Sequence, residues 1–183
     1  MSNAITFSPD LDKFNNSGRF GSVVQIVSVL LKRIEAVNNI FDYPQKDRVN
    51  CNVRLRHKTI GYRIVDPNFL SVDIEGRLEI APGGENKEGE KHLLATIIAV
   101  YELKYILPKE PMPKEYENWI GDFADINGVY NAWPYFRARM QDLASDMGIA
   151  FTLPTFRIIP KKSSQPIEES KLTKPKMVKR IRK

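Results

Sequence analysis

Residues 70–80 alternate strictly between two kinds of side chain, and this pattern limits the fold more than any other part of the sequence. Alternate positions are apolar at Leu70, Val72, Ile74, Leu78 and Ile80. The positions between them hold Ser71, Asp73, Glu75, Arg77 and Glu79. Successive side chains of a strand point to opposite faces of a sheet. The segment therefore predicts a strand with one face in a core and the other in solvent.

Two further segments have the period of a strand. Apolar and polar residues alternate from Val49 through Cys51 to Leu55. Residues 93–107 alternate as well, but their first half is apolar on both faces and therefore needs cover on both sides. We expect helices of the same chain on one face and another subunit or a bound polypeptide on the other. The alternative is that the N-terminal and C-terminal helices cover both faces of a monomeric sheet. Residues 81–91 combine turn formers with charge and predict a loop between the last two strands.

Two other segments have helical spacing. Apolar residues three and four apart run from Phe20 to Ile34. A second set of apolar residues, spaced three and four apart, runs from Trp133 to Met147. Asn131 is the predicted N-cap of this helix, and Gly148 is the residue predicted to end it. Prolines fill the preceding loop, and residues 149–159 predict an extended segment. Strands and helices in this order predict an α+β fold.

The charge of the chain is concentrated at its C-terminal end. Of 183 residues, 42% are hydrophobic and 27% are charged, which is typical of one globular domain. Residues 161–183 hold nine of the 28 basic side chains and two of the 22 acidic ones, so the remainder carries 19 basic and 20 acidic groups. We therefore predict a flexible leader at 1–17, a domain at 18–160 and a disordered basic tail at 161–183.

Residue patterns for catalysis or metal binding are absent from the sequence. His57 and His92 lie without a Cys or carboxylate at ligand spacing, so we expect no metal and no cofactor. Asp122 and Asp125 are interpreted as charges at a helix start, and Cys51 as a core residue. The lone cysteine forms no internal disulfide, and no secretory signal or membrane span is recognisable. We expect a cytoplasmic protein that is not an enzyme.

Residues 129–137, Val-Tyr-Asn-Ala-Trp-Pro-Tyr-Phe-Arg, resemble the start of the long helix in SecB-type chaperones. The Gly148 and Leu153-Pro154 that follow fit the same family, and the resemblance spans about residues 28–160. It implies a four-stranded antiparallel sheet packed against this helix. The family has its first strand near residues 29–38, whereas the spacing of apolar residues predicts a helix as far as Ile34. We therefore predict a helix to about Ser28, followed by a strand.

The resemblance also implies a function, namely ATP-independent holding of non-native polypeptides by a tetramer built as a dimer of dimers. The client groove would lie between the sheet and the helix layer. Its implied lining residues are Tyr101, Tyr105, Trp119, Trp133, Tyr135, Phe136, Phe151 and Phe156. Export chaperones of this family are strongly acidic where they meet SecA, whereas this core is nearly neutral, which makes SecA docking doubtful. SecB-like relatives that support toxin–antitoxin systems are an equally good match.

Two alternatives stay open at this stage. One is an adaptor that binds a single dedicated partner, such as an antitoxin or a phage or plasmid factor. The other is weak association with nucleic acid or another anionic partner through the basic tail. The tail residues concerned are Lys174, Lys176, Lys179, Arg180, Arg182 and Lys183. No aromatic residue accompanies them, so sequence-specific recognition of bases is not expected.

Overall fold

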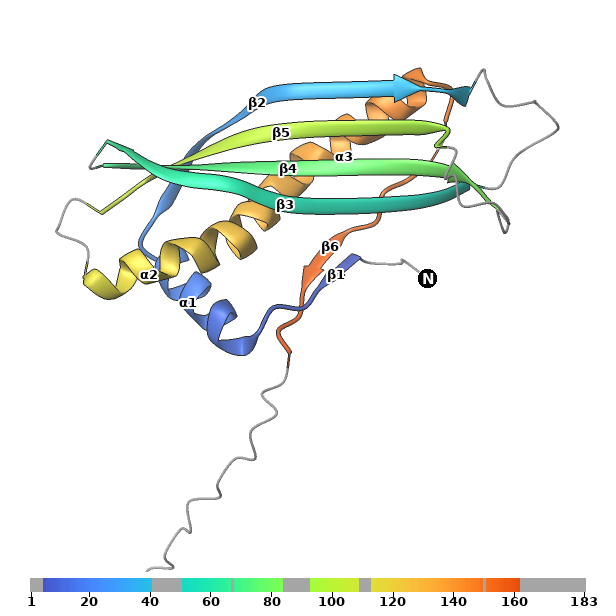
Figure 1. The fold of residues 1–183 in the computed structure, drawn as a ribbon. Coiled ribbons are helices and arrows are strands. Elements are labelled where there is room, and N and C mark those ends of the chain that lie inside the picture. The colour runs from blue at the N-terminus through green and yellow to red at the C-terminus, as the bar shows by residue number, and fades with distance from the viewer. Residues whose placement is uncertain are drawn as a thin grey trace, which may run out of the picture.

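The computed structural model describes residues 5–40, 51–66, 68–83, 93–108, 113–149 and 151–161. Strands β1 (Ile5–Phe7) and β6 (Phe156–Ile158) form a small two-stranded parallel sheet. Strands β2 (Gln25–Asn38), β3 (Cys51–Asp66), β4 (Phe69–Pro82) and β5 (Ala95–Ile106) form an antiparallel sheet in the order β2-β5-β4-β3. The helices are α1 (Leu11–Gly21), α2 (Lys114–Phe123) and α3 (Val129–Asp146), with a π-helical turn at Ala124–Gly128 (Figure 1).

The α+β fold predicted from the sequence is confirmed, with a four-stranded antiparallel sheet and a long C-terminal helix. The alternating segment at residues 70–80 is central strand β4, and Leu78 lies between Leu55 of β3 and Ile97 of β5. Strand β4 continues to Pro82, so the predicted loop begins later than expected. Strand β3 extends to Asp66, well beyond the short strand that the sequence pattern indicated.

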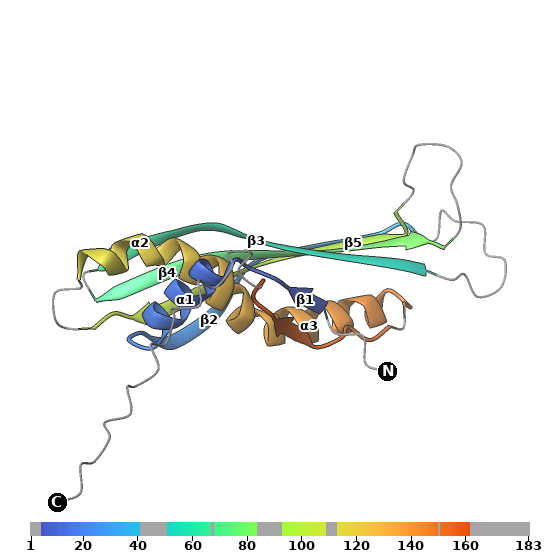
Figure 2. The same cartoon turned by 90° about the horizontal axis from the view of Figure 1, so that it is seen from below.

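Helix α3 crosses one face of the sheet, and the main core lies between them (Figures 1 and 2). Phe136 is buried there over Gly76 of β4. A Cβ atom at residue 76 would lie 2.8 Å from two atoms of the Phe136 ring, so only glycine allows the helix to approach this closely. Gly76, the one residue that interrupts the alternation of β4, is therefore where helix α3 approaches this strand closely.

The long helix begins earlier than predicted. Helices α2 and α3 run on through the π-helical turn, so Asn131 lies inside the helix and is not its N-cap. The Asn131 amide instead donates to Tyr105 Oη at 3.1 Å. Asp122 lies at the end of α2, away from a helix start, and its carboxylate accepts a hydrogen bond from Asn16 at 2.9 Å. Gly148 has φ of 77°, as predicted for a residue that ends a helix.

The helix predicted for residues 20–28 is wrong beyond Gly21, because this segment enters strand β2 at Gln25. Two bulges in β2 explain the misleading spacing. They fall between Ile26 and Ser28 and between Leu31 and Arg33, and each adds one residue to the strand. The residues on the face of β2 directed toward the helices are consequently three, two and three positions apart: Ile26, Val29, Leu31 and Ile34. The last three pack against the core, whereas Ile26 is 40% exposed. Apolar residues at this spacing are similar to those of an amphipathic helix, which explains the wrong prediction.

The leader predicted at residues 1–17 contains β1 and most of α1 within the described residues. Phe20 of α1 is fully buried and packs against Phe123 with ring centroids 5.0 Å apart. One other expectation also differs. Cys51 is exposed at the start of β3 and is not a core residue. On the second apolar face of β5, Val100 is only 6% exposed, whereas Ile98 is partly buried.

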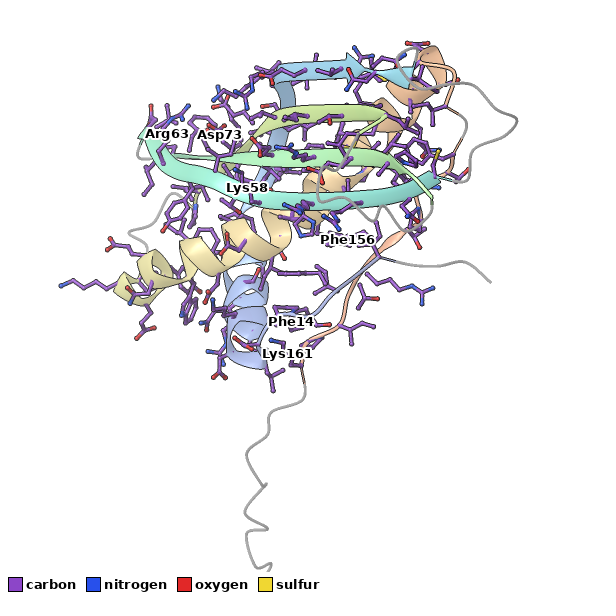
Figure 3. All side chains as sticks on the ribbon, turned by 45° about the vertical axis from the view of Figure 1, so that its right-hand side comes forward. Phe14, Lys58, Arg63, Asp73, Phe156 and Lys161 are labelled. Carbon is purple, nitrogen blue, oxygen red and sulfur yellow. The ribbon has the colours of Figure 1, made fainter. Side chains whose placement is uncertain are left out.

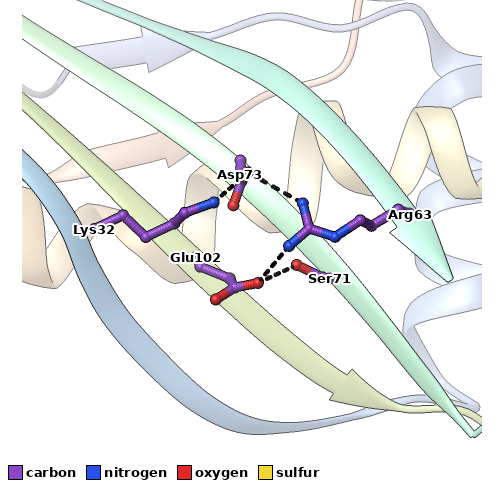
Figure 4. A network of polar contacts seen from close by, with 5 residues as sticks. All are labelled: Lys32, Arg63, Ser71, Asp73 and Glu102. Carbon is purple, nitrogen blue, oxygen red and sulfur yellow. Dashed lines mark hydrogen bonds and ion pairs between the residues drawn. The ribbon is translucent and has the colours of Figure 1, made fainter. Parts of the chain in front are cut away.

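The face of the sheet opposite α3 carries a network of ion pairs (Figure 4). Asp73 contacts Lys32 at 2.8 Å and Arg63 at 3.6 Å. Glu102 contacts Arg63 at 3.1 Å and accepts a hydrogen bond of 2.6 Å from the Ser71 hydroxyl. The Ser71 hydrogen bond lowers the pKa of the Glu102 carboxyl below its ordinary value. The charged form of Glu102 is therefore the one that this face stabilises.

Substituting Ser71→Ala should make the fold more sensitive to acid. Because the pKa of Glu102 is lower in the folded chain, its contribution to stability is present above the ordinary pKa and is lost as pH falls through the folded one. Loss of the hydroxyl returns the pKa of Glu102 toward its ordinary value, so acid unfolding begins at a higher pH. Circular dichroism along a pH titration from 7 to 2 measures this shift, and an unchanged midpoint would refute it.

Candidate functional site

Two adjoining hollows lie between α3, β6 and the start of β2. The first has a volume of about 490 Å³ and is lined by Ile26, Tyr130, Asn131, Trp133, Pro134, Tyr135, Arg137, Thr155 and Phe156. The second has a volume of about 580 Å³ and is lined by Phe14, Asn127, Tyr130, Asn131, Phe156, Arg157, Ile158 and Ile159. Tyr130, Asn131 and Phe156 line both hollows, and we refer to the two hollows together as the Tyr130 groove.

Exposed aromatic side chains distinguish the Tyr130 groove from the core. Tyr130 is 52% exposed and Tyr135 is 46% exposed, although both belong to a helix whose other face is buried. Trp133 lies between them and is buried, and its indole N–H has no hydrogen-bond partner among the described residues. Large amphipathic rings at a surface provide apolar contact area together with a polar group. The groove can therefore accept apolar side chains of a bound molecule.

The helix backbone places these aromatic residues at the groove. Pro134 has no N–H, so the Tyr130 carbonyl four residues earlier loses its ordinary helical donor. The π-helical turn just before α3 adds a residue to one turn and changes the direction in which later side chains point. Tyr101 Oη donates to the Tyr135 carbonyl at 3.3 Å, which fixes this turn of α3 on strand β5. One wall of the groove is thus helix α3.

The other wall of the groove is the segment around β6. Arg137 Nε donates to the Leu153 carbonyl at 2.9 Å and holds this segment on α3. Phe156 packs against Trp133 and against His57 of β3, with ring centroids 5.3 Å and 5.4 Å apart. Burial lowers the pKa of His57, which favours the neutral imidazole between Phe156 and Phe7. Phe156, whose position beside the large sheet is labelled in Figure 3, therefore has ring contacts with Trp133, His57 and Phe7.

The structure divides the predicted client residues into three groups. Trp133, Tyr135 and Phe156 line the Tyr130 groove. Tyr101, Tyr105 and Phe136 are buried in the main core, and burial raises the pKa of Tyr105 to about 12. Trp119 and Phe151 are half-buried and lie elsewhere, with Trp119 stacked on Tyr116 and under the Arg19 guanidinium. The six basic residues predicted to contact anionic partners lie outside the described part of the chain.

Sequence reasoning missed several groove residues, chief among them Tyr130. Its position four residues before Pro134 was a usable signal, because a proline inside a helix frees the carbonyl at that distance. Ile26 was assigned to a helix and Phe14 to the leader, so neither was considered a groove residue. Their contribution depends on contacts between segments that are far apart in the chain.

Comparison with known proteins identifies the fold. No family model matches the chain, and no curated protein sequence matches it. The SecB-like chaperone of Mycobacterium tuberculosis, solved in complex with a ChAD peptide from the HigA1 antitoxin, superposes with a TM-score of 0.60. The alignment covers 78% of this chain and 98% of that chain at 19% sequence identity. The fold is SecB-like. The resemblance found in residues 129–156 is confirmed at the level of the fold.

A second structural match is a protein of unknown function from Streptococcus agalactiae. Its TM-score is 0.27 at 10% identity, with 71% of this chain and 95% of that chain covered, and it carries no further weight. Within the described ranges, no helix is both long and apolar enough to cross a membrane. No group of three or more His, Cys, Asp or Glu side chains in the same ranges could hold a metal ion.

Proposed function

We propose that this chain is an ATP-independent holdase that binds non-native polypeptides in the Tyr130 groove. The observation that carries the proposal is an open groove lined by half-exposed aromatic residues on a SecB-like fold. Folded proteins of different sequence expose similar apolar side chains when they unfold, so an apolar groove recognises the non-native state in general. Holding requires no bond to be broken, and the proposal therefore needs neither a nucleotide nor a metal.

The bound client in the structural neighbour supports this proposal. That protein was solved with a peptide from an antitoxin, so the same fold accommodates a polypeptide segment. The second candidate function of this chain is to bind one dedicated client, such as an antitoxin. General and dedicated binding differ in client range, since only a general holdase binds unrelated unfolded proteins with similar affinity. Nucleic-acid association through the tail would instead be abolished by deleting residues 161–183.

We further infer that the chain assembles with copies of itself in the cytoplasm, as the resemblance to tetrameric chaperones implies. Strand β2 supports this assembly because it is an edge strand of 14 residues. Its exposed apolar residues are Ile26, Val27, Leu30 and Val37. A long edge with exposed apolar side chains readily pairs with another strand. Several grooves in one assembly would engage a long client with greater avidity than one groove alone.

Titration with unrelated unfolded proteins tests the proposed function. Reduced, carboxymethylated α-lactalbumin and reduced, carboxymethylated ribonuclease A serve as permanently unfolded clients, each labelled with a fluorophore. A general holdase raises the fluorescence anisotropy of both clients at similar concentrations and leaves their native forms unbound. Binding of neither protein would refute holding of general clients. Binding of an antitoxin peptide alone would favour the dedicated adaptor.

A further inference from the structure

Within the described part of the chain, strand β6 uses one of its two edges for backbone hydrogen bonds. The Ile5 N–H donates to the Thr155 carbonyl at 2.9 Å, and the Ile159 N–H donates to the Phe7 carbonyl at 2.9 Å. Alternate residues of a strand direct their N–H and C=O groups to opposite edges. The backbone groups of Phe156 and Ile158 therefore point away from β1. Among the described residues, none forms a hydrogen bond with them.

This second edge of β6 borders the Tyr130 groove. Phe156 and Ile158 both line the hollow that also contains Phe14 of α1 and Tyr130 of α3. Figure 3 shows Phe14 and Phe156 on the same side of the large sheet, with Phe14 near the end of the described chain at Lys161 and Phe156 closer to the sheet. The unpaired backbone groups and the apolar groove consequently occur at one place. Unpaired N–H and C=O groups at a strand edge are a template for another extended segment.

Strand β1 demonstrates that β6 accepts such a segment. Residues 5–7 lie outside the large sheet and pair in parallel with β6 in the register Ile5 to Phe156 and Phe7 to Ile158. Phe7 at the same time packs on Phe156 and on His57, with ring centroids 6.4 Å and 5.7 Å apart. Backbone pairing and side-chain packing thus act together on one edge of β6. The opposite edge offers both features and has no occupant in the described chain.

We propose that an extended segment of a client pairs with the free edge of β6 as a third strand. This inference rests on the proposed holdase function and specifies how the client is bound. The client backbone exchanges hydrogen bonds with Phe156 and Ile158, while its alternate apolar side chains enter the Tyr130 groove. Main-chain hydrogen bonds give affinity that does not depend on the client sequence, and the groove selects apolar residues at every second position. Proline at a paired position of the client is excluded because it lacks an N–H.

Amide hydrogen exchange of the full-length chain tests this proposal directly. The probe is a synthetic seven-residue peptide of alternating phenylalanine and threonine, added to ¹⁵N-labelled protein. In the free protein, the amides of Phe156 and Ile158 exchange fast, whereas those of Arg157 and Ile159 are protected by β1. Saturating peptide should slow the two fast amides at least about tenfold and leave the other two unchanged.

Four other results would overturn the proposal. Binding of the peptide with the two amides still fast would place the client elsewhere and leave the holdase function standing. Loss of protection at Arg157 and Ile159 would show that the client displaces β1 instead. Protection of Phe156 and Ile158 in the free protein at high concentration would show a second copy on this edge. Failure of both the peptide and unfolded proteins to bind would refute the holdase function itself.

Removing a backbone N–H, either from strand β6 or from the peptide, tests the strand pairing independently. Ile158→Pro removes the N–H on the free edge, and Ile158→Val keeps it while shortening the side chain. We expect Ile158→Pro to weaken peptide binding about 5- to 10-fold, as for loss of one hydrogen bond, and Ile158→Val, which keeps the N–H, to weaken it clearly less. If Ile158→Pro fails to fold, the same test is made on the peptide. N-methylation at alternate peptide positions should abolish binding for one set and spare the other, and equal effects of both sets would contradict strand pairing.

Discussion

Replacing Phe136 with alanine should lower the free energy of unfolding by about 3–5 kcal/mol, the usual cost of removing a buried phenylalanine. The Phe136 ring is 1% exposed and lies between α3 and the large sheet. It contacts Tyr101 edge-on, with ring centroids 4.9 Å apart. It also occupies the space over Gly76, which has no side chain of its own to fill the cavity left by alanine. Urea denaturation measures the loss.

Tyr135→Ala is the matched control for this prediction. Tyr135 is the preceding residue on the same helix but is 46% exposed, so its removal should cost less than about 1 kcal/mol. Equal losses for both variants would contradict the assignment of Phe136 to the core and Tyr135 to the groove. The comparison matters because sequence reasoning placed both residues in the client groove.

The double substitution Tyr130→Ser with Tyr135→Ser should weaken the binding of unfolded clients by about 30-fold, which corresponds to about 2 kcal/mol. Both rings line the Tyr130 groove and are about half exposed, so a client can bury the remaining apolar area. The stability of the chain should change little, since neither ring belongs to the main core. Anisotropy titration with carboxymethylated α-lactalbumin and thermal unfolding measure the two effects separately.

Tyr62→Ser provides the control for surface tyrosines in general. Tyr62 of β3 is 51% exposed but does not line the groove. Its substitution should leave client affinity unchanged. If Tyr62→Ser weakens binding as much as the double variant, the groove is not the client site. If none of the variants changes affinity, the exposed aromatics of α3 have no part in holding.

The sequence predicted the large sheet well where the strands are regular. Strand β4 was recognised because its Leu70 to Ile80 alternation is uninterrupted except at Gly76. The assignment of its apolar face to the core is confirmed, whereas its polar face is partly buried instead of open to solvent, with Ser71 only 1% exposed. Strand β2 was taken for a helix over its first residues because two bulges change the spacing of its core-facing side chains. Bulges depend on how two strands pair, so the sequence of one strand does not reveal them.

The candidate site was predicted in part. Trp133, Tyr135 and Phe156 were named from a family resemblance, and the structure places all three at the groove. Tyr101, Tyr105 and Phe136 were named with them but face the core, because aromatic residues on a periodic face are more often packing residues. The pairing of β1 with β6 was not predictable, because each strand has three residues and the two lie about 150 residues apart.

Light scattering from an aggregating client tests the central claim most directly. Chemically denatured citrate synthase is diluted into buffer without nucleotide, in the presence of the full-length chain or of its Tyr130→Ser and Tyr135→Ser variant. We predict that the unmodified chain suppresses scattering near a stoichiometric ratio and that the variant requires a large excess. Scattering that proceeds unchanged with the unmodified chain, for this and other unrelated clients, would contradict the account of a general holdase.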